Sequence, residues 1–533
     1  MLTLRLTDSL QKIFSDGPLP PARDRLFALR TERVALQACL AADAGTDAVL
    51  TVETDLPVKL YTVREIPARL TVPEGAKNCT LLKNGRPGPY PDLLTPLTGP
   101  VRTEPGRLTA VWIELTAAVP GAHAVRVSAE TETGRAEARA TVFVAKDALP
   151  PQTLLYTDWF HADCLASFYR VPVFSEEHWA IVDRFLGNAA EHGVNLILTP
   201  LFTPALDTAV GHERPTTQLV DVTLTPDGWT FGFSRLSRWI AVCRKHGIGH
   251  FEFSHFFTQW GAKACPKVVA DTPEGARRVF GWDTEALSPA YVDFLTALGR
   301  ALTAFTDEMG ITENCFVHVS DEPGGGDLPQ YRACAAVIRN AFGVYRHLDA
   351  LSDVDFYREG LVQIPVPEEG SVDAFTAAGV KDLWTYYCCG QYENELPNRF
   401  FAMPSIRNRI LGALLYKYGC AGFLHWGFNF YFTQYSLREA DPFTETDAGG
   451  AFPSGDSFTV YPGPGGEPLP SLREKVFYEG LQDLRALKAL EAKIGRARTL
   501  GLLRDCLGEI TFRSYPMDET RLLTLRQRVY EAL

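Results

Sequence analysis

The sequence predicts an α/β protein in which an all-β sandwich domain precedes a (β/α)8 barrel of the TIM type. Two observations carry this prediction. Up to residue 148 the chain alternates apolar and polar residues in short segments separated by Gly, Pro and Asp, which is typical of a sandwich. From residue 149 to residue 440 the pattern changes to apolar strand, loop and helix, repeated eight times. That rhythm favours a barrel over a doubly wound sheet.

The first domain, residues 1–148, is expected to consist of strands. Segments such as DAVLTVETDL, RLTAVWIEL and RAEARATVFVA place apolar residues at every second position. One face of each strand can therefore pack while the other meets solvent. The segment KDALPPQ ends the domain, because Pro150 and Pro151 interrupt both helices and strand ladders.

The second domain, residues 149–440, contains the barrel strands. The candidates are TLLYTDWF, VNLILTPLF, GHFEFSHFF, CFVHVSDEP, YRHLDALSD, LVQIPVP, DLWTYYCC and AGFLHWGFNF. Helical stretches lie between most of them; the first, EEHWAIVDRFLGNAAEHG, ends on a glycine stop signal.

The third part, residues 441–533, begins with a Gly-, Pro- and Asp-rich stretch that holds the short strand SFTVYPG. A helix is expected to start near Ser471, because apolar residues recur there at helical spacing, namely Phe477, Leu481, Leu484 and Leu487. We expect this helix to dock on the barrel.

Composition narrows the classes of function. The formal net charge of -12 argues against nucleic acid or an anionic membrane as partner, since both reward basic surfaces. The sequence offers neither the apolar core of a signal peptide nor a run long enough for a transmembrane helix. Its 11 cysteines are scattered without a CxxC pair, which favours free thiols in a reducing compartment. We therefore predict a cytoplasmic protein.

Paired carboxylates mark the end of the fourth predicted barrel strand. Asp321 and Glu322, in the segment HVSDEP, are followed by Pro323 and three glycines. Catalytic groups of such barrels lie at the carboxyl ends of the strands. Two carboxylates held close together cannot both ionise easily, so one of them keeps a proton that it can donate near neutral pH. A second interpretation stays open, because acidic residues also cap helix N-termini.

Aromatic, histidine and asparagine side chains stand at the ends of the other predicted strands. Aromatic faces stack on the apolar face of a sugar ring, and the polar groups offer hydrogen bonds to hydroxyls or amides. The candidates for substrate binding are Trp159, His255, His318, Trp384, Tyr386, Tyr387, Trp426 and Asn429. Because neighbours on a strand point to opposite faces, we expect only one of Tyr386 and Tyr387 in the pocket. For the same reason, His425 should point into packing if Trp426 points inward.

A metal site receives less support from the sequence. The residues that could gather at one barrel mouth as ligands are His161, Asp163, His255, His318 and Asp349. A metal-dependent hydrolase of the amidohydrolase kind would carry an HxH motif on the first strand, where this chain reads His161-Ala162-Asp163. The glycines after Pro323 lack the lysine and the spacing of a phosphate-binding loop. We expect no cofactor and no metal.

The motif FVHVSDEP resembles glycoside hydrolase family 123 and its broad relatives. The resemblance includes TDWFHADCLA, GFLHWGFNFY, GDSFTVYPG and SLREKVFYEGLQDLRAL, and so spans the chain from the linker onward. It implies a retaining, substrate-assisted glycosidase for terminal β-linked 2-acetamido sugars, with N-acetylgalactosamine preferred. The predicted cytoplasmic location indicates a small oligosaccharide or glycoside as the substrate. It further implies that Glu322 is the general acid/base. Asp321 would orient the acetamido group and stabilise its developing positive charge.

Two other functions stay open at this point. A two-carboxylate glycosidase acting on a sugar without the acetamido group would need a second essential acid opposite Glu322, with Glu252 and Asp349 as candidates. A non-catalytic carbohydrate-binding protein would hold a sugar without turnover. We also expect the polar insertion after the second strand, DTAVGHERPTTQLVDVTLTPDGW, to reshape the pocket through His212, Glu213 and Arg214.

Overall fold

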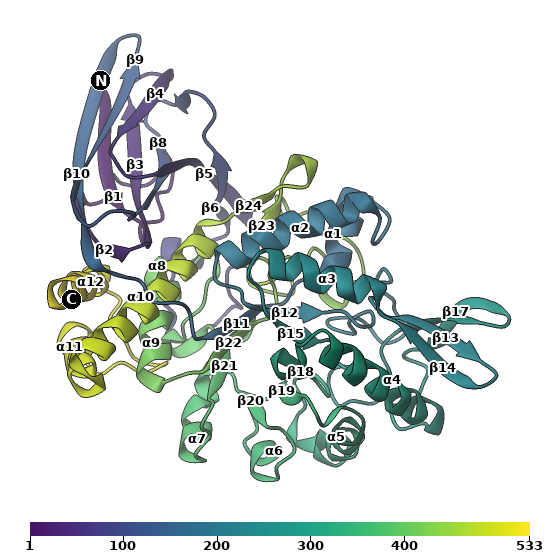
Figure 1. Ribbon diagram of the computed structural model, residues 1–533. Coiled ribbons are helices and arrows are strands. Elements are labelled where there is room, and N and C mark those ends of the chain that lie inside the picture. Colours follow the sequence, from purple (N-terminus) through teal and green to yellow (C-terminus); the bar gives the residue numbers. More distant parts are fainter.

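The computed structural model describes residues 1–533 and has an N-terminal β-rich part joined to a larger α/β part (Figure 1). One sheet of the β-rich part has the strand order β1 (Leu2–Asp8), β3 (Arg33–Ala42), β8 (Leu108–Thr116), β5 (Val58–Ala68) and β6 (Gly88–Pro96). The other has the order β2 (Arg25–Arg30), β10 (Gly134–Ala148), β9 (Gly121–Thr131), β4 (Thr46–Glu53) and β7 (Val101–Thr103). A shared apolar core lies between the two sheets and includes Leu36, Val111, Ile113, Val125 and Val127.

Eight parallel strands form the centre of the α/β part. Five of them make one sheet, in the order β12 (Leu196–Thr199), β15 (His250–Phe253), β18 (Cys315–Val317), β19 (Arg346–Ala350) and β20 (Ile364–Val366). The other three make a second sheet, in the order β11 (Leu155–Asp158), β22 (Gly422–His425) and β21 (Trp384–Tyr386). The strands lie where the sequence predicted them, but their ladders divide them between two sheets.

A helix follows every one of these strands along the chain. The helices between them are α1 (Ala162–Tyr169), α2 (Glu176–Glu191), α3 (Ser234–Lys245), α4 (Pro289–Glu308), α5 (Leu328–Phe342), α6 (Asp355–Arg358), α7 (Val372–Ala377), α8 (Ser405–Arg409) and α9 (Leu411–Tyr418). Helix α2 begins after Ser175, whose side chain accepts a hydrogen bond from the backbone N–H of His178 at 3.2 Å.

The insertion after β12 forms strands, which differs from the expected loop. Hairpin β13 (Asp221–Thr225) and β14 (Gly228–Gly232) joins β16 (Val268–Thr272) and β17 (Gly275–Phe280) in a four-stranded sheet. This sheet projects from the side of the α/β part, at the right of Figure 1. The pairing of two segments far apart along the chain stabilises the insertion, and periodicity within one segment cannot reveal that pairing.

The C-terminal part contains strands β23 (Val460–Pro462) and β24 (Pro468–Pro470) and helices α10 (Leu472–Ile494), α11 (Arg496–Leu507) and α12 (Glu519–Ala532). Helix α10 begins after Ser471, as predicted, and the Ser471 hydroxyl accepts the N–H of Glu474 at 3.0 Å. It packs closely on α9, since a Cβ at Gly412 would lie 1.9 Å from the carbonyl oxygen of Gly480. Helix α10 therefore docks on a helix of the α/β part.

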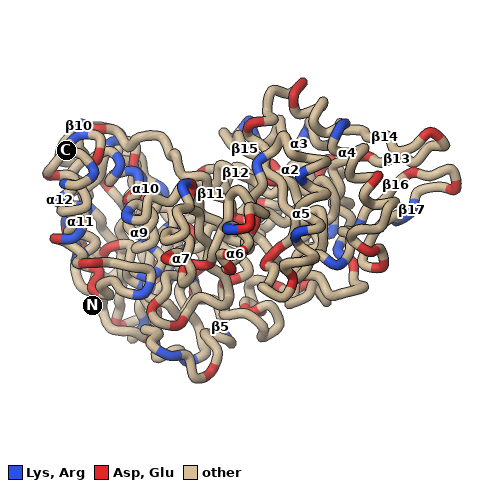
Figure 2. Tube along the Cα trace, turned by 90° about the horizontal axis from the view of Figure 1, so that it is seen from below, with Lys and Arg blue, Asp and Glu red and all other residues tan.

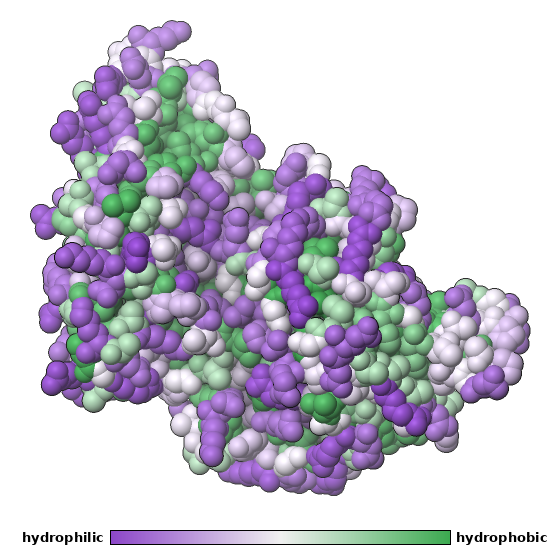
Figure 3. All heavy atoms as spheres, viewed as in Figure 1, coloured by the Kyte–Doolittle hydropathy of each residue, from purple (hydrophilic) through white to green (hydrophobic).

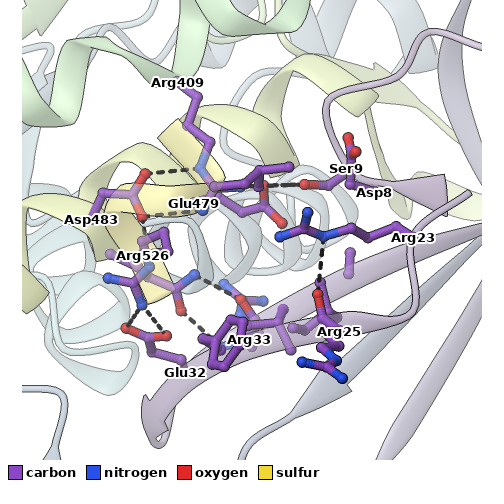
Figure 4. Close-up of a pocket in the computed structure, with 16 residues that line it drawn as sticks. Asp8, Ser9, Arg23, Arg25, Glu32, Arg33, Arg409, Glu479, Asp483 and Arg526 are labelled. Atoms are coloured by element: carbon purple, nitrogen blue, oxygen red, sulfur yellow. Dashed lines mark hydrogen bonds and ion pairs between the residues drawn. The ribbon is translucent and has the colours of Figure 1, made fainter. Parts of the chain in front are cut away.

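Buried ion pairs join the β-rich part to α10 and α12 (Figure 4). Arg526 contacts both carboxylate oxygens of Glu32 at 2.6 Å and lies 3.2 Å from Asp483. Arg409 contacts Asp483 at 2.8 Å and Glu479 at 2.7 Å. These charged side chains are buried, so each charge depends on its ion-pair partners for stabilisation.

Charged residues of both signs are interspersed along the chain (Figure 2), and hydrophilic residues occupy much of the face drawn in Figure 3. None of the helices combines the length and the apolar character that crossing a membrane requires.

Candidate active site

The two adjacent carboxylates occupy a turn just beyond β18. Glu322 adopts a left-handed backbone conformation, with φ of 44°, which is uncommon for a residue other than glycine. Its N–H donates to the carbonyl oxygen of Ala350 at 3.1 Å, and the carbonyl oxygen of Asp321 accepts the N–H of Trp260 at 3.1 Å. This conformation allows both neighbouring side chains to line one cavity. Asp327, and neither of these two acids, lies at the start of α5, so the helix-cap interpretation fails.

A cavity of about 200 Å³ surrounds the pair. This volume is enough for several water molecules or a small ligand. Its wall is mostly apolar, with a few polar groups, as is typical of small-ligand sites. The lining residues are Trp159, Leu206, Asp207, Gln259, Trp260, Asp321, Glu322, Ala350, Tyr386, Cys388, Cys389, Leu424, Trp426, Gln434 and Phe452.

The surroundings favour a protonated form of the acid pair. Burial raises the pKa of Asp321, and the charge of Glu322 raises it further, while the charge of His318 opposes both effects. The side chain of Glu322 faces the cavity, and desolvation by the surrounding protein raises its pKa. A hydrogen bond from the Tyr386 hydroxyl to Oε1 has the opposite effect and lowers it. Both pKa values are thus raised, and because the two acids interact they titrate as a unit.

A buried hydrogen-bond network supports the cavity from inside. The Trp159 indole Nε1 donates to Glu252 Oε1 at 2.7 Å, and His318 Nε2 lies 2.7 Å from the same oxygen. His318 Nδ1 lies 2.9 Å from Asp349 Oδ1. Burial disfavours the charged imidazole, but hydrogen bonds to Asp349 and Glu252 outweigh it and raise the pKa of His318 to about 9. His318 is therefore an imidazolium between two carboxylates, and it holds Trp159 in place through Glu252.

Comparison with known proteins decides the family. The model of the glycoside hydrolase 123 catalytic domain matches residues 159–490, which is more than half of the chain and includes both carboxylates. The chain belongs to glycoside hydrolase family 123. The resemblance seen in the sequence is thereby confirmed. A search of curated proteins finds no match.

Solved structures support the fold of this family 123 chain. A family 123 glycoside hydrolase from Clostridium perfringens, from a structural analysis of glycolipid glycan hydrolysis, superposes with a TM-score of 0.75 at 14% identity. The match covers 100% of this chain and 98% of that one. A putative β-galactosidase from Bacteroides fragilis covers 86% of this chain and 58% of its own, at 9% identity. Its TM-score of 0.33 is too low to support any conclusion.

The family 123 cavity contains three of the eight residues that the sequence proposed for substrate binding, namely Trp159, Tyr386 and Trp426. Tyr387 points the other way from Tyr386, as neighbours on a strand do, and its ring packs 5.3 Å from that of His425. His425 thus lies in packing, as expected from the inward position of Trp426.

The structure corrects the other proposed positions, which do not line the cavity. Trp384 is the first residue of β21 and lies too deep, with its indole over Gly422, where a Cβ would lie 2.1 Å from the ring. Asn429 is used structurally, because its side chain accepts the N–H of His161 at 2.8 Å. His255 stacks on His318 at 4.1 Å, and both are buried beside the network that holds Trp159.

Several cavity residues come from loops. Gln259 and Trp260 follow the third strand closely, and their position just after His255 indicated a place near the strand end, although neither was among the eight candidates for substrate binding. Asp207, Gln434 and Phe452 carry no such signal, since they come from long connections whose path depends on tertiary contacts.

The insertion acts on the cavity through only one of its three expected residues. Arg214 is buried and contacts Asp163 at 2.7 Å, while its Nη1 donates to the carbonyl oxygen of Leu206 at 3.1 Å. Leu206 lines the cavity, so Arg214 supports the wall indirectly. Glu213 instead pairs with Lys267 at 2.6 Å and with Arg278, and His212 is exposed.

The candidate metal ligands divide into two groups. Donor atoms of His255, His318 and Asp349 lie within 4.8 Å of one another. A protonated His318, with both nitrogens directed at carboxylates, has no lone pair to offer a cation. His161 and Asp163 are engaged by Arg214. The donor set therefore fits an imidazolium held by two acids better than it fits a metal ion.

Proposed function

We propose that this family 123 enzyme removes terminal β-linked 2-acetamido sugars, with N-acetylgalactosamine preferred, by a retaining, substrate-assisted mechanism. The observation that carries the proposal is the position of Asp321 and Glu322, which are adjacent in the chain and line the same cavity. Neighbouring acids suit a reaction in which the substrate supplies its own nucleophile, because no carboxylate then has to attack from the opposite face.

The first step needs one acid and one anion. The acetamido carbonyl oxygen attacks the anomeric carbon, the bond to the leaving oxygen breaks, and Glu322 donates a proton to that oxygen. A cyclic oxazolinium forms, and the Asp321 carboxylate stabilises the positive charge on its N–H. Because the nucleophile belongs to the substrate, its effective concentration is very high.

The second step reverses the direction of proton transfer. Glu322 accepts a proton from water as the water oxygen bonds to the anomeric carbon and the oxazolinium opens. Both displacements invert the anomeric carbon, so the net result is retention. The positive charge of the intermediate favours the ionised form of Asp321, which leaves the single proton of the pair to Glu322.

The aromatic wall has a role in this proposal. Trp159 and Trp426 are both fixed by their indole nitrogens; Trp426 Nε1 donates to Asp456 at 3.0 Å. Rigid indoles offer flat platforms for the sugar ring and its acetamido methyl group. Tyr386 orients the proton donor through its hydrogen bond to Glu322.

A two-carboxylate mechanism has less support. Glu252 and Asp349, the acids that it would recruit, do not line the cavity and bind His318 instead. Asp207 is the remaining cavity carboxylate. Two results together would favour this alternative: a wild type that prefers sugars without an acetamido group, and an Asp207→Asn variant that no longer hydrolyses them.

The architecture supports a barrel for this reaction. Backbone hydrogen bonds join the two sheets at both edges, from Asn195 N to Tyr156 O at 3.2 Å and from Tyr386 N to Pro367 O at 3.1 Å. We therefore propose a (β/α)8 barrel closed across these edges. The proposed domains are residues 1–148, 149–440 and 441–533.

A panel of chromogenic β-glycosides tests the proposed function. Release from 2-acetamido sugars, together with tight competitive inhibition by the matching thiazoline, is expected, since a thiazoline mimics the cyclised intermediate. Hydrolysis confined to plain hexosides would refute the substrate-assisted mechanism. Sugar binding without turnover by the wild type, unchanged in Glu322→Gln, would indicate a binding protein.

A further inference from the structure

A buried carboxylate with few partners lies behind the aromatic wall of the cavity. Asp456, in the segment between β22 and β23, is fully buried and does not line the cavity. Its Oδ2 accepts the Trp426 indole N–H at 3.0 Å, while its Oδ1 has no hydrogen-bond partner. Buried charges are ordinarily paired, because their removal from water is costly. A buried carboxylate with an unpaired oxygen therefore requires an explanation.

The neighbouring histidine does not supply a positive charge to Asp456. His425 Nδ1 accepts the backbone N–H of Gly427 at 3.0 Å, so the ring proton is on Nε2 and the imidazole is neutral. Nε2 lies 3.6 Å from Asp456 Oδ1, which is too long for a hydrogen bond. Asp158 Oδ1 lies 3.3 Å from Nδ1 and likewise has no hydrogen-bond partner.

Two buried arginines near this segment are already paired with other acids. Arg399 contacts Asp158 at 2.8 Å, and Arg473, which donates to the carbonyl oxygen of the residue before Asp456, contacts Asp92 at 2.8 Å. The charge of Asp456 is therefore not cancelled by a cation in contact with it.

The charge of Asp456 acts on the acid pair through the cavity wall. Burial raises the pKa of Glu322, and the hydrogen bond from Tyr386 lowers it. The negative charge of Asp456 raises this pKa further, and that of Glu368 has a smaller effect in the same direction. Asp321 interacts with Glu322 as the second acid of the pair. The wall contains no lysine, arginine or histidine that would oppose these charges, and its other titratable groups are Asp207, Cys388 and Cys389.

We propose that Asp456 is a positioning residue whose buried negative charge keeps the proton on Glu322 between turnovers. This inference rests on the proposed function, in which Glu322 donates that proton to the leaving oxygen. A nearby negative charge makes the loss of a proton from an acid less favourable. A deprotonated Glu322 cannot donate, so the charge of Asp456 extends the pH range of activity on the alkaline side. The same carboxylate holds Trp426, so one side chain sets both the wall and the protonation of the donor.

The test is the pH dependence of kcat/KM for the phenyl β-glycoside of N-acetylgalactosamine, whose poor leaving group needs a proton. The alkaline limb of this profile reports the loss of the donor's proton in the free enzyme. Asp456→Asn keeps the size of the side chain and an oxygen that can accept the Trp426 N–H, but it removes the charge. We expect its alkaline limb at lower pH than in the wild type. Asp456→Ser, which is smaller and also neutral, should shift the limb in the same direction and provides the result if Asp456→Asn does not fold.

The matched control is Asp447→Asn, the same substitution in the same segment. Asp447 is also buried, but it is paired with Arg69 at 3.2 Å and does not line the cavity. Its variant should keep the alkaline limb of the wild type. If Asp456 only holds Trp426 in place, its neutral variants will lower kcat/KM by the same factor at every pH and leave the limb where it is.

An unmoved limb in Asp456→Asn and Asp456→Ser, with turnover by the wild type, would overturn the inference while the proposed function stands. An equal shift in Asp447→Asn would also overturn it, since the shift would then not depend on the position of Asp456. A wild type that neither cleaves the phenyl glycoside nor binds the thiazoline would overturn the proposed function, and the inference with it.

Discussion

Charge on His318 should make the stability of this protein depend on pH. His318 lies between Glu252 and Asp349 with no solvent exposure, and its pKa is raised from 6.5 to about 9. At ~1.4 kcal/mol per pKa unit, this shift corresponds to about 3 kcal/mol of folding free energy. Because the folded-state pKa exceeds the unfolded value, this contribution is complete below pH 6.5 and is lost as the pH rises through 9.

The assay is urea unfolding of the wild type and of His318→Gln at several values between pH 6 and pH 10. Other buried groups titrate in this window, among them Glu474, whose pKa burial raises to about 8, so the quantity of interest is the difference between the two proteins. We expect the wild-type advantage to shrink by about 3 kcal/mol across the window. A constant difference would show that His318 is neutral in the folded protein. The exposed His212→Gln serves as control and should follow the wild type.

Three further predictions address the site and its supports. Glu322→Gln should lower kcat by roughly 10²–10⁴-fold on a disaccharide that ends in β-linked N-acetylgalactosamine. The loss should be smaller on the β-fluoride of N-acetylgalactosamine, because fluoride needs no proton to leave. Equal losses on the two substrates would contradict a proton-donor role. Tyr386→Phe removes a hydrogen bond that lowers the pKa of Glu322, so the alkaline limb of the kcat/KM profile should move to higher pH, and an unchanged limb would refute this role of Tyr386. Arg214→Ala leaves buried Asp163 unpaired and should destabilise the protein by roughly 3–5 kcal/mol in thermal unfolding; restoration by Asp163→Asn in the double variant would confirm the cause.

The sequence predicted most of the regular structure because that structure depends on local patterns. Short apolar runs located the eight strands, and apolar residues at helical spacing located α10. The sheet that holds the insertion was not predictable in this way, because β13 pairs with β16, more than forty residues away, in a parallel ladder.

Depth along a strand explains which of the proposed residues line the cavity. Trp384 and Tyr386 share a face of β21, but at ~3.3 Å per residue Trp384 lies about 7 Å further from the mouth. Residue type and parity suggested both, and only the residue at the strand end reaches the cavity. The residues from loops, such as Asp207, depend on tertiary contacts that the sequence does not display. The cytoplasmic location expected from the scattered cysteines stays a prediction.

The backbone conformation at Glu322 is one that glutamate disfavours, although the proposed mechanism needs a carboxylic acid at this position. A left-handed φ of 44° suits glycine and disfavours a glutamate by about 1 kcal/mol or more. A Glu322→Gly protein should therefore unfold at a higher temperature than the wild type, while it loses the proposed proton donor. Selection for thermal stability alone would favour replacement of Glu322 by glycine, and selection for catalysis would retain the glutamate.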